Sequence, residues 1–139
     1  MKISARNQFV GKVVEVKEGA VNAIVILELA GGNKISSTIS LNAVKELGIA
    51  VGSIATAIIK STSVMLADST LKISARNQLT GKVVEIKEGA VNDIVSVELA
   101  GGNKVSSTIS LSSVKELEIS VGSEVTAIVK STSVMLATE

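Results

Sequence analysis

The sequence predicts an all-β protein made of two similar units in tandem, each with one short helix. Residues 2–69 reappear as residues 72–139 at a constant offset of 70, without insertion or deletion. Each copy consists mainly of runs rich in β-branched residues, separated by turns that contain glycine. We therefore expect one domain over residues 1–68 and a second over residues 71–139.

The first half of each copy predicts three strands. Residues 10–18 alternate β-branched and polar side chains until Gly19, and residues 21–29 form a second apolar run. The Gly-Gly-Asn cluster at residues 31–33 stands between two apolar runs, which is typical of a hairpin turn. This turn leads into a third strand over residues 34–39.

The second half of each copy predicts a helix and a final strand region. Ser40 has a residue type that commonly begins helices. Leu41, Val44 and Leu47 follow at the spacing of one helical face, which predicts a short helix ending at Leu47. The last strand region is expected over residues 54–67. Five strands and one helix in roughly 65 residues favour a five-stranded Greek-key barrel of the OB type in each copy.

Composition favours contacts between units and between chains. The linker at residues 68–70 has no proline and no charge run, so the two units are expected to touch. A barrel of about 70 residues is usually stabilised by disulfides, metals or oligomerisation. The sequence has no cysteine or histidine, and it is 46% hydrophobic with only 19% charged residues. We therefore expect a homo-oligomer without disulfides or bound metal cations.

The residue inventory argues against several classes of function. The sequence contains no Cys, His, Tyr or Trp, and its carboxylates have the spacing of solvated faces, so no catalytic residue is expected and an enzyme is unfavoured. A net charge of +1, no basic run and Phe9 as the only aromatic residue argue against nucleic acid binding. No apolar run approaches a membrane span, and no signal-peptide core follows Met1, which favours the cytoplasm.

Two polar motifs in each copy suit a small anion. Ser-Ala-Arg-Asn begins at Ser4, and Lys-Ser-Thr-Ser begins at Lys60. A tetrahedral dianion needs cations to balance its charge and neutral donors for its remaining lone pairs, which Arg, Lys, Ser and backbone N–H groups provide. Each motif alone is also typical of solvated surface. Residues 19–22 are most simply a plain turn, and the alternative is a backbone nest whose N–H groups face an anion.

In combination these motifs resemble a known family. Ser-Ala-Arg-Asn-Gln, Gly-Lys-Val-Val, Lys-Glu-Gly-Ala-Val-Asn, Glu-Leu-Ala-Gly-Gly-Asn and Lys-Ser-Thr-Ser-Val-Met together resemble the Mop domain of the molbindins, small cytoplasmic bacterial proteins that bind molybdate. The resemblance covers each copy almost from end to end. It implies OB-like barrels, a ring of six Mop units formed by a homotrimer of this chain, and oxyanion sites at interfaces between units.

The resemblance also implies which residues bind molybdate or tungstate. Each copy supplies one set of residues for a principal site. Ala5 and Ala75 act through the backbone, and the serine at the helix start comes from a neighbouring unit. The two sets are Ser4, Ala5, Arg6, Ser40, Lys60 and Ser61; Ser74, Ala75, Arg76, Ser110, Lys130 and Ser131. A second class of oxyanion site is expected at two loops: Gly19, Ala20, Val21 and Asn22; Gly89, Ala90, Val91 and Asn92.

The function implied by the resemblance is non-enzymatic binding of molybdate for intracellular storage and homeostasis, with the anion as ligand and no cofactor. Two alternatives are a structural β-barrel assembly module and an oxyanion-sensing domain of a regulator or transporter. The 139 residues contain no helix-turn-helix or ATPase segment, which favours the storage function.

Overall fold

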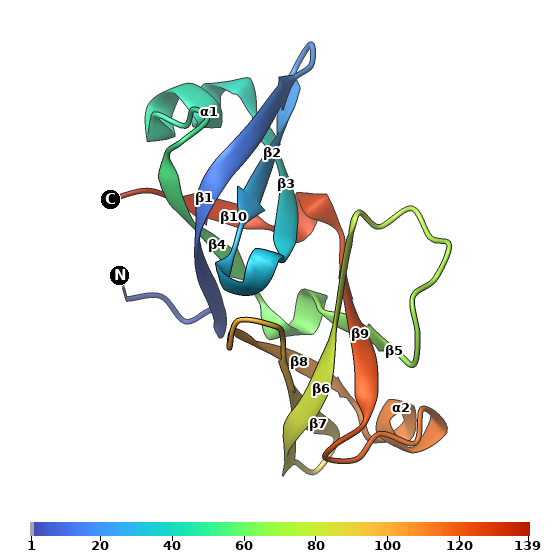
Figure 1. Ribbon diagram of the computed structural model, residues 1–139. Coiled ribbons are helices and arrows are strands. Elements are labelled where there is room, and N and C mark those ends of the chain that lie inside the picture. Colours follow the sequence, from blue (N-terminus) through green and yellow to red (C-terminus); the bar gives the residue numbers. More distant parts are fainter. Residues whose placement is uncertain (1) are drawn as a thin grey trace.

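A computed structural model, which describes residues 2–139, confirms two OB-like all-β units with one short α-helix each (Figure 1). The elements of the first repeat are β1 (Asn7–Glu18), β2 (Asn22–Glu28), η1 (Ala30–Gly32), β3 (Lys34–Ser40), α1 (Leu41–Leu47), β4 (Ile54–Ile59), η2 (Ser61–Ser63) and β5 (Met65–Ala67). Those of the second are β6 (Asn77–Glu88), β7 (Asn92–Glu98), β8 (Lys104–Ser110), α2 (Leu111–Glu116), β9 (Glu124–Val129), η3 (Ser131–Ser133) and β10 (Met135–Ala137). No helix within the described part of the chain is long and apolar enough to span a membrane.

Each five-stranded sheet takes its last strand from the other repeat. The strand orders are β10-β4-β1-β2-β3 and β5-β9-β6-β7-β8, so the four long strands of each repeat have the Greek-key order 4-1-2-3. β10 pairs with β4 and places Met135 opposite Ile58, whereas β5 pairs with β9 and places Met65 opposite Ile128. Figure 1 shows β10, in red, beside the green and blue strands of the first repeat.

This exchange divides the final strand region that the sequence predicted over residues 54–67. β4 stays with its own repeat, but the 3₁₀ turn η2 interrupts the strand because the Ser63 N–H bonds to Lys60 O and the Val64 N–H to Ser61 O. The chain then continues as β5 in the sheet of the other repeat. Boundaries at residues 68 and 71 separate the sequence repeats, but they do not separate the two sheets.

The core is shared by the two repeats. Side chains on β1 to β3 alternate between buried and exposed positions, as expected for strands with one face inward. Val13, Val25 and Leu27 are fully buried, and they belong to one apolar cluster that also includes residues of the second repeat, such as Val83 and Val95. The expected contact between the two units is therefore confirmed.

The helix predicted over residues 41–47 is confirmed at both ends. The Ser40 hydroxyl accepts the Ala43 N–H at 3.0 Å, which is the N-cap interaction its residue type predicted. Val44 is buried, and Leu41 and Leu47 pack against the core. The helix ends at Leu47, and the following Gly48 caps it with a left-handed φ of 65°.

The Gly-Gly-Asn hairpins predicted from the sequence are also confirmed, and the two turns pack against each other. Glu28 pairs with Lys34 across the first turn. A Cβ atom on Gly31 would collide with the Ala100 carbonyl. The Asn33 side chain donates a hydrogen bond to the same carbonyl at 3.2 Å. Glycine is therefore needed here both for its φ of 85° and for the close approach of two backbones.

Candidate functional site

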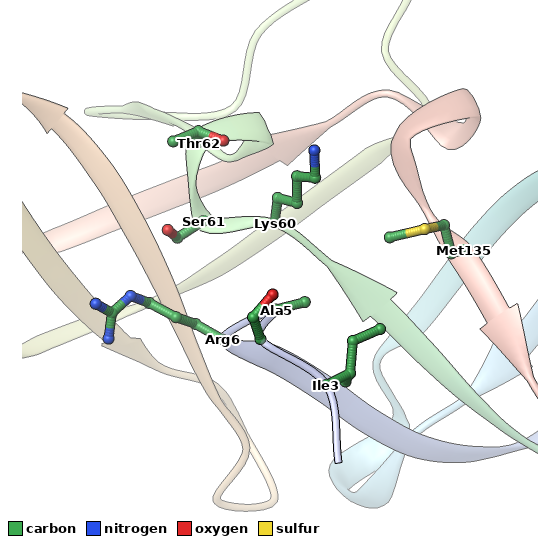
Figure 2. A pocket seen from close by; sticks show the side chains of 8 residues that line it. Ile3, Ala5, Arg6, Lys60, Ser61, Thr62 and Met135 are labelled. Atoms are coloured by element: carbon green, nitrogen blue, oxygen red, sulfur yellow. The ribbon is translucent and has the colours of Figure 1, made fainter. Parts of the chain in front are cut away.

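The start of β1 and the end of β4 meet at one pocket. Asn7 pairs with Ile59, so Arg6 just before β1 and Lys60 just after β4 lie at the same edge of the sheet. The pocket has a volume of about 430 Å³ and is open to solvent. Its lining consists of Ile3, Ser4, Ala5, Arg6, Lys60, Ser61, Thr62 and Met135 (Figure 2).

The second repeat forms an equivalent pocket of about 350 Å³. It is lined by Met65, Ile73, Ser74, Ala75, Arg76, Lys130, Ser131 and Thr132. In each copy, the structure thus brings together all the residues that were predicted for the principal site except the serine at the helix start. In each pocket, a methionine comes from the opposite repeat.

A buried asparagine anchors the arginine of each pocket to the other repeat. Asn7 follows Arg6 directly and is 1% exposed. Its side chain donates to Ser106 O at 2.9 Å and accepts the Ser106 N–H at 2.7 Å, so it pairs with β8 as another strand would. Asn77 makes the same two hydrogen bonds to Ser36, at 2.9 and 2.7 Å. These hydrogen bonds therefore hold the backbone next to the arginine of each pocket in place.

The serine beside each lysine is also tied to the other repeat. Ser61 is 8% exposed, and its hydroxyl lies 2.7 Å from that of Thr108 on β8. Three residues further on, Val64 O accepts a hydrogen bond from the buried Ser107 hydroxyl at 2.6 Å. A hydroxyl can accept one hydrogen bond while donating another. If Thr108 donates to Ser61, the Ser61 proton remains available to a ligand.

The charged groups of the pocket are suited to an anion. Arg6 and Lys60 are exposed, and no ion pair joins either of them to a carboxylate within residues 2–139. Figure 2 shows the two side chains leaving the pocket wall in different directions. The lining contains no acidic residue, and Ser4, Ser61 and Thr62 add neutral donors. The pocket therefore has two cations and several hydroxyls, but within one chain they surround an open volume.

Ser40 and Ser110, which were predicted to join the principal sites from a neighbouring unit, do not line either pocket within one chain. Both are exposed N-cap residues at the ends of β3 and β8. Each hydroxyl accepts a backbone N–H from its own helix, at 3.0 Å for Ser40 and 3.1 Å for Ser110. Their contribution from a neighbouring unit stays a prediction.

The loops predicted as a second oxyanion site are exposed hairpin tips. The Gly19 N–H already bonds to Asn22 O at 2.8 Å, which is the plain turn that the sequence left open. Val21 at the tip is 72% exposed. In the second loop, the Gly89 N–H instead donates to the buried carboxylate of Asp93 at 3.3 Å. Binding at these loops also stays a prediction, and the negative charge of Asp93 opposes an anion at the second loop.

Sequence reasoning missed three kinds of residue that shape the pockets. The Asn7 side chain was read as part of a polar motif and Thr108 was assigned no role, whereas the hydrogen bonds of both residues join the repeats. Their recurrence as Asn77 and Thr38 at apparently solvated positions was the available signal. Met135 carried no signal, because its position in the pocket depends on the strand exchange.

The fold and the pockets define a small β-barrel protein that holds cationic pockets where two barrel units meet. This chain belongs to the TOBE domain family, which it matches over residues 3–66 and again over residues 73–136. The two matches correspond to the two sequence repeats.

Relatives carry names that refer to molybdenum. The chain is 41% identical over 138 residues to the molybdenum transport protein ModE of Azotobacter vinelandii, covering 99% of this chain and 51% of that protein. It thus spans about half the length of that relative. One repeat is 59% identical over 69 residues to a probable molybdenum-pterin-binding protein of Haemophilus influenzae, covering 50% of this chain and 100% of that protein.

A solved structure matches the whole chain. The cytoplasmic molybdate-binding protein ModG, crystallised with molybdate bound, superimposes with a TM-score of 0.97 at 40% identity. The match covers 100% of both chains. It supports the tandem OB-like fold over the full length, including the arrangement of the two repeats. These relatives are named for binding or transport of molybdenum compounds.

Proposed function

We propose that this chain binds molybdate without catalysis, and that the two inter-repeat pockets are its principal sites. The observation that carries the proposal is that Arg6, Lys60 and Ser61 line one pocket that has no carboxylate in its lining. The arrangement is repeated at Arg76, Lys130 and Ser131. The full-length match at 40% identity to a molybdate-bound protein supports the choice of anion.

The proposed mechanism is replacement of the hydration shell by fixed donors. The arginine and the lysine balance the two negative charges of the anion. The Ser61 hydroxyl and the backbone near Ala5 supply neutral hydrogen bonds, each anchored by contacts to the other repeat. A charge-assisted hydrogen bond contributes roughly 1.5–3 kcal/mol. A few such bonds are enough to hold a dianion once water is excluded.

Assembly into a homotrimer would complete the pockets. Both pockets are open within one chain, and Arg6 and Lys60 of the first pocket point in different directions. Exposed apolar side chains such as Val10, Val51 and Ile54 provide surface that a second copy would cover. In a ring of six barrel units, Ser40 and Ser110 would reach pockets of neighbouring chains. We further propose that the protein works in the cytoplasm as a molybdate store, and that tungstate binds in the same way.

The direct test is titration calorimetry with molybdate, tungstate and sulfate, together with elemental analysis of protein purified without added metal. We expect molybdate and tungstate to bind alike and sulfate much more weakly, because the larger anions lose their hydration at lower cost. Equal affinity for sulfate would replace the molybdate assignment with a generic anion site. Absence of binding to all three would favour the structural assembly module.

A second candidate function is an oxyanion-sensing module of a larger transport or regulatory protein. It is favoured by the match to ModE, of which this chain covers 51%. The same pockets would serve in both cases. The candidates differ in the consequence of binding, so a molybdate-dependent change in the chain's association with another protein would favour sensing over storage.

A further inference from the structure

One side chain in the first pocket comes from the second repeat. β10 pairs with β4 and places Met135 opposite Ile58, so Met135 joins the pocket beside Lys60. In Figure 2 its side chain extends from β10 toward the Lys60 side of the pocket. Met135 is 44% exposed. Much of its thioether therefore faces the open pocket rather than the core.

The second pocket has the mirror arrangement. Met65 pairs with Ile128 and lines the pocket of Lys130, and it is 43% exposed. The short segment 60–65 thus supplies the lysine of one pocket at its start and the methionine of the other pocket at its end. Segment 130–135 does the same in the opposite direction.

An apolar side chain in the lining of a cationic pocket affects which anion the pocket prefers. A thioether donates no hydrogen bond and holds adjacent water weakly. Excluding water lowers the local dielectric and strengthens the attraction between the cations and an anion. The anion must in turn give up its own hydration on that side, which costs less for a large oxyanion with diffuse charge than for a compact one. Such a side chain favours molybdate over sulfate.

We propose that Met135 and Met65 are specificity-determining residues, each for the pocket whose cations belong to the opposite repeat. The inference rests on the proposed oxyanion binding and extends it to residues outside the polar motifs. Under this proposal, each pocket needs residues from both repeats. Truncating the methionine of one repeat should weaken molybdate binding at the pocket whose arginine and lysine lie in the other repeat.

The test isolates one pocket at a time in the full chain. A background with Arg76→Met and Lys130→Met leaves the first pocket with its cations, and a background with Arg6→Met and Lys60→Met leaves the second. Met135→Ala is then added to each background. Calorimetry measures the dissociation constants for molybdate and for sulfate, and light scattering confirms that the assembly is unchanged.

In the first-pocket background, we expect Met135→Ala to weaken molybdate binding about tenfold, which corresponds to about 1.4 kcal/mol. The ratio of molybdate to sulfate affinity should fall as well, and a merely structural role would not move that ratio. In the second-pocket background, the change should be less than about twofold, within the usual scatter of about 0.5 kcal/mol for independent sites. Met65→Ala should show the reverse pattern.

Two control variants separate packing from specificity. Met135→Leu keeps an apolar side chain of similar size and should retain both affinity and the molybdate preference. Val14→Ala truncates an apolar side chain, 36% exposed, that lines neither pocket, and should change neither quantity.

The outcomes distinguish the inference from the function on which it rests. If wild-type protein binds no molybdate, the proposed function fails. If wild-type protein binds molybdate but Met135→Ala leaves the first pocket unchanged, or weakens the second pocket instead, the binding function stands and the crossed role of the methionines is overturned.

Discussion

The two repeats are identical where they form the pockets and differ elsewhere. Every polar pocket residue of the first repeat recurs in the second, as do the asparagine, threonine and methionine that join the pockets to the opposite repeat. The differences fall on the core, the strand residue next to the hairpin loop, the helix end and the exposed sheet face. Ala23 is replaced by Asp93, Gly48 by Glu118 and Ile54 by Glu124. The pockets depend on side chains and hydrogen bonds contributed in both directions between the repeats, and none of the residues that line them differs between the copies.

The core differences show how each repeat can vary alone. Phe9 is replaced by Leu79, which removes volume, and Ala55 on the paired strand is replaced by Val125, which adds it. All four side chains are buried. Cores tolerate such compensated exchanges at little cost because total volume is kept. A change in a residue that bonds across the repeats has no comparable compensation within its own barrel.

The largest expected effect comes from the asparagines that bridge the repeats. Asn7→Ala leaves the N–H and C=O of Ser106 without their partner, and an unpaired buried polar group costs roughly 1–3 kcal/mol. We expect a loss of about 2–4 kcal/mol in the free energy of unfolding, measured by urea denaturation. Asn77→Ala should cost the same, because its two hydrogen bonds have the same lengths.

The neighbouring Gln8 provides the matched control for this prediction. It bonds to Ala5 O at 3.1 Å in an exposed setting. Gln8→Ala should therefore stay within about 0.5 kcal/mol of wild type. A marked inequality between the two asparagine variants would show that the repeats do not support each other symmetrically.

The next effect concerns affinity. Lys60→Met and Lys130→Met each remove one pocket cation and keep most of the side-chain stem. Each lost contact should cost roughly 1.5–3 kcal/mol, about 10- to 150-fold in molybdate affinity at one pocket. Calorimetry should give the same loss for both variants. The proposed trimer should survive in the double variant, because the stems do most of the packing. Unchanged molybdate binding would make these lysines ordinary surface charges.

A smaller effect would reveal the difference between the hairpin loops. Asp93 places a buried carboxylate against the second loop, and the first repeat has Ala23 there. We expect residues 19–22 to bind an oxyanion better than residues 89–92. Ala23→Asp should weaken binding at the first loop about tenfold, or about 1.4 kcal/mol, and Asp93→Ala should strengthen it at the second. Calorimetry on chains without the four pocket cations measures this, and no response in either variant would remove the loops as sites.

The smallest effect lies at the helix ends. Glu118 has a φ of 53°, a conformation that Gly48 adopts at the same position of the first repeat. A non-glycine residue in this conformation is strained, and replacing it by glycine removes the strain. Glycine also has more freedom in the unfolded chain, which offsets part of that gain. On balance, Glu118→Gly should stabilise the folded protein by about 0.5–1 kcal/mol. Gly48→Glu should destabilise by a similar amount in thermal unfolding. Opposite signs would mean that the glutamate makes a compensating interaction.

Sequence reasoning predicted most of the fold because local signals agreed with it. The Gly-Gly-Asn turn, the Ser40 cap and the apolar alternation each specify an element within a few residues. The strand exchange could not be predicted. Residues 64–67 and 134–137 have the same sequence, Val-Met-Leu-Ala, so their pairing preferences do not distinguish one sheet from the other.

The candidate site was predicted to the extent that its chemistry is local. The Arg6 and Lys60 motifs contain the charges of the pocket, and antiparallel pairing of their strands brings them together. Met135 reaches the pocket from the exchanged strand β10, so no local sequence pattern could indicate its position there. Ser40 was expected at the site and serves within the chain as a helix cap. A contact between Ser40 and a bound anion would require a pocket of a neighbouring chain.

The two inter-repeat pockets are the proposed molybdate sites, and counting bound anions tests them most directly. Equilibrium dialysis of the intact chain against molybdate is compared with a variant in which Arg6, Lys60, Arg76 and Lys130 are all replaced by methionine. We expect the variant to keep its fold and assembly but to bind two molybdate ions fewer per chain than wild type, one for each pocket. Equal molybdate binding by the two proteins would contradict the assignment of the anion to these pockets.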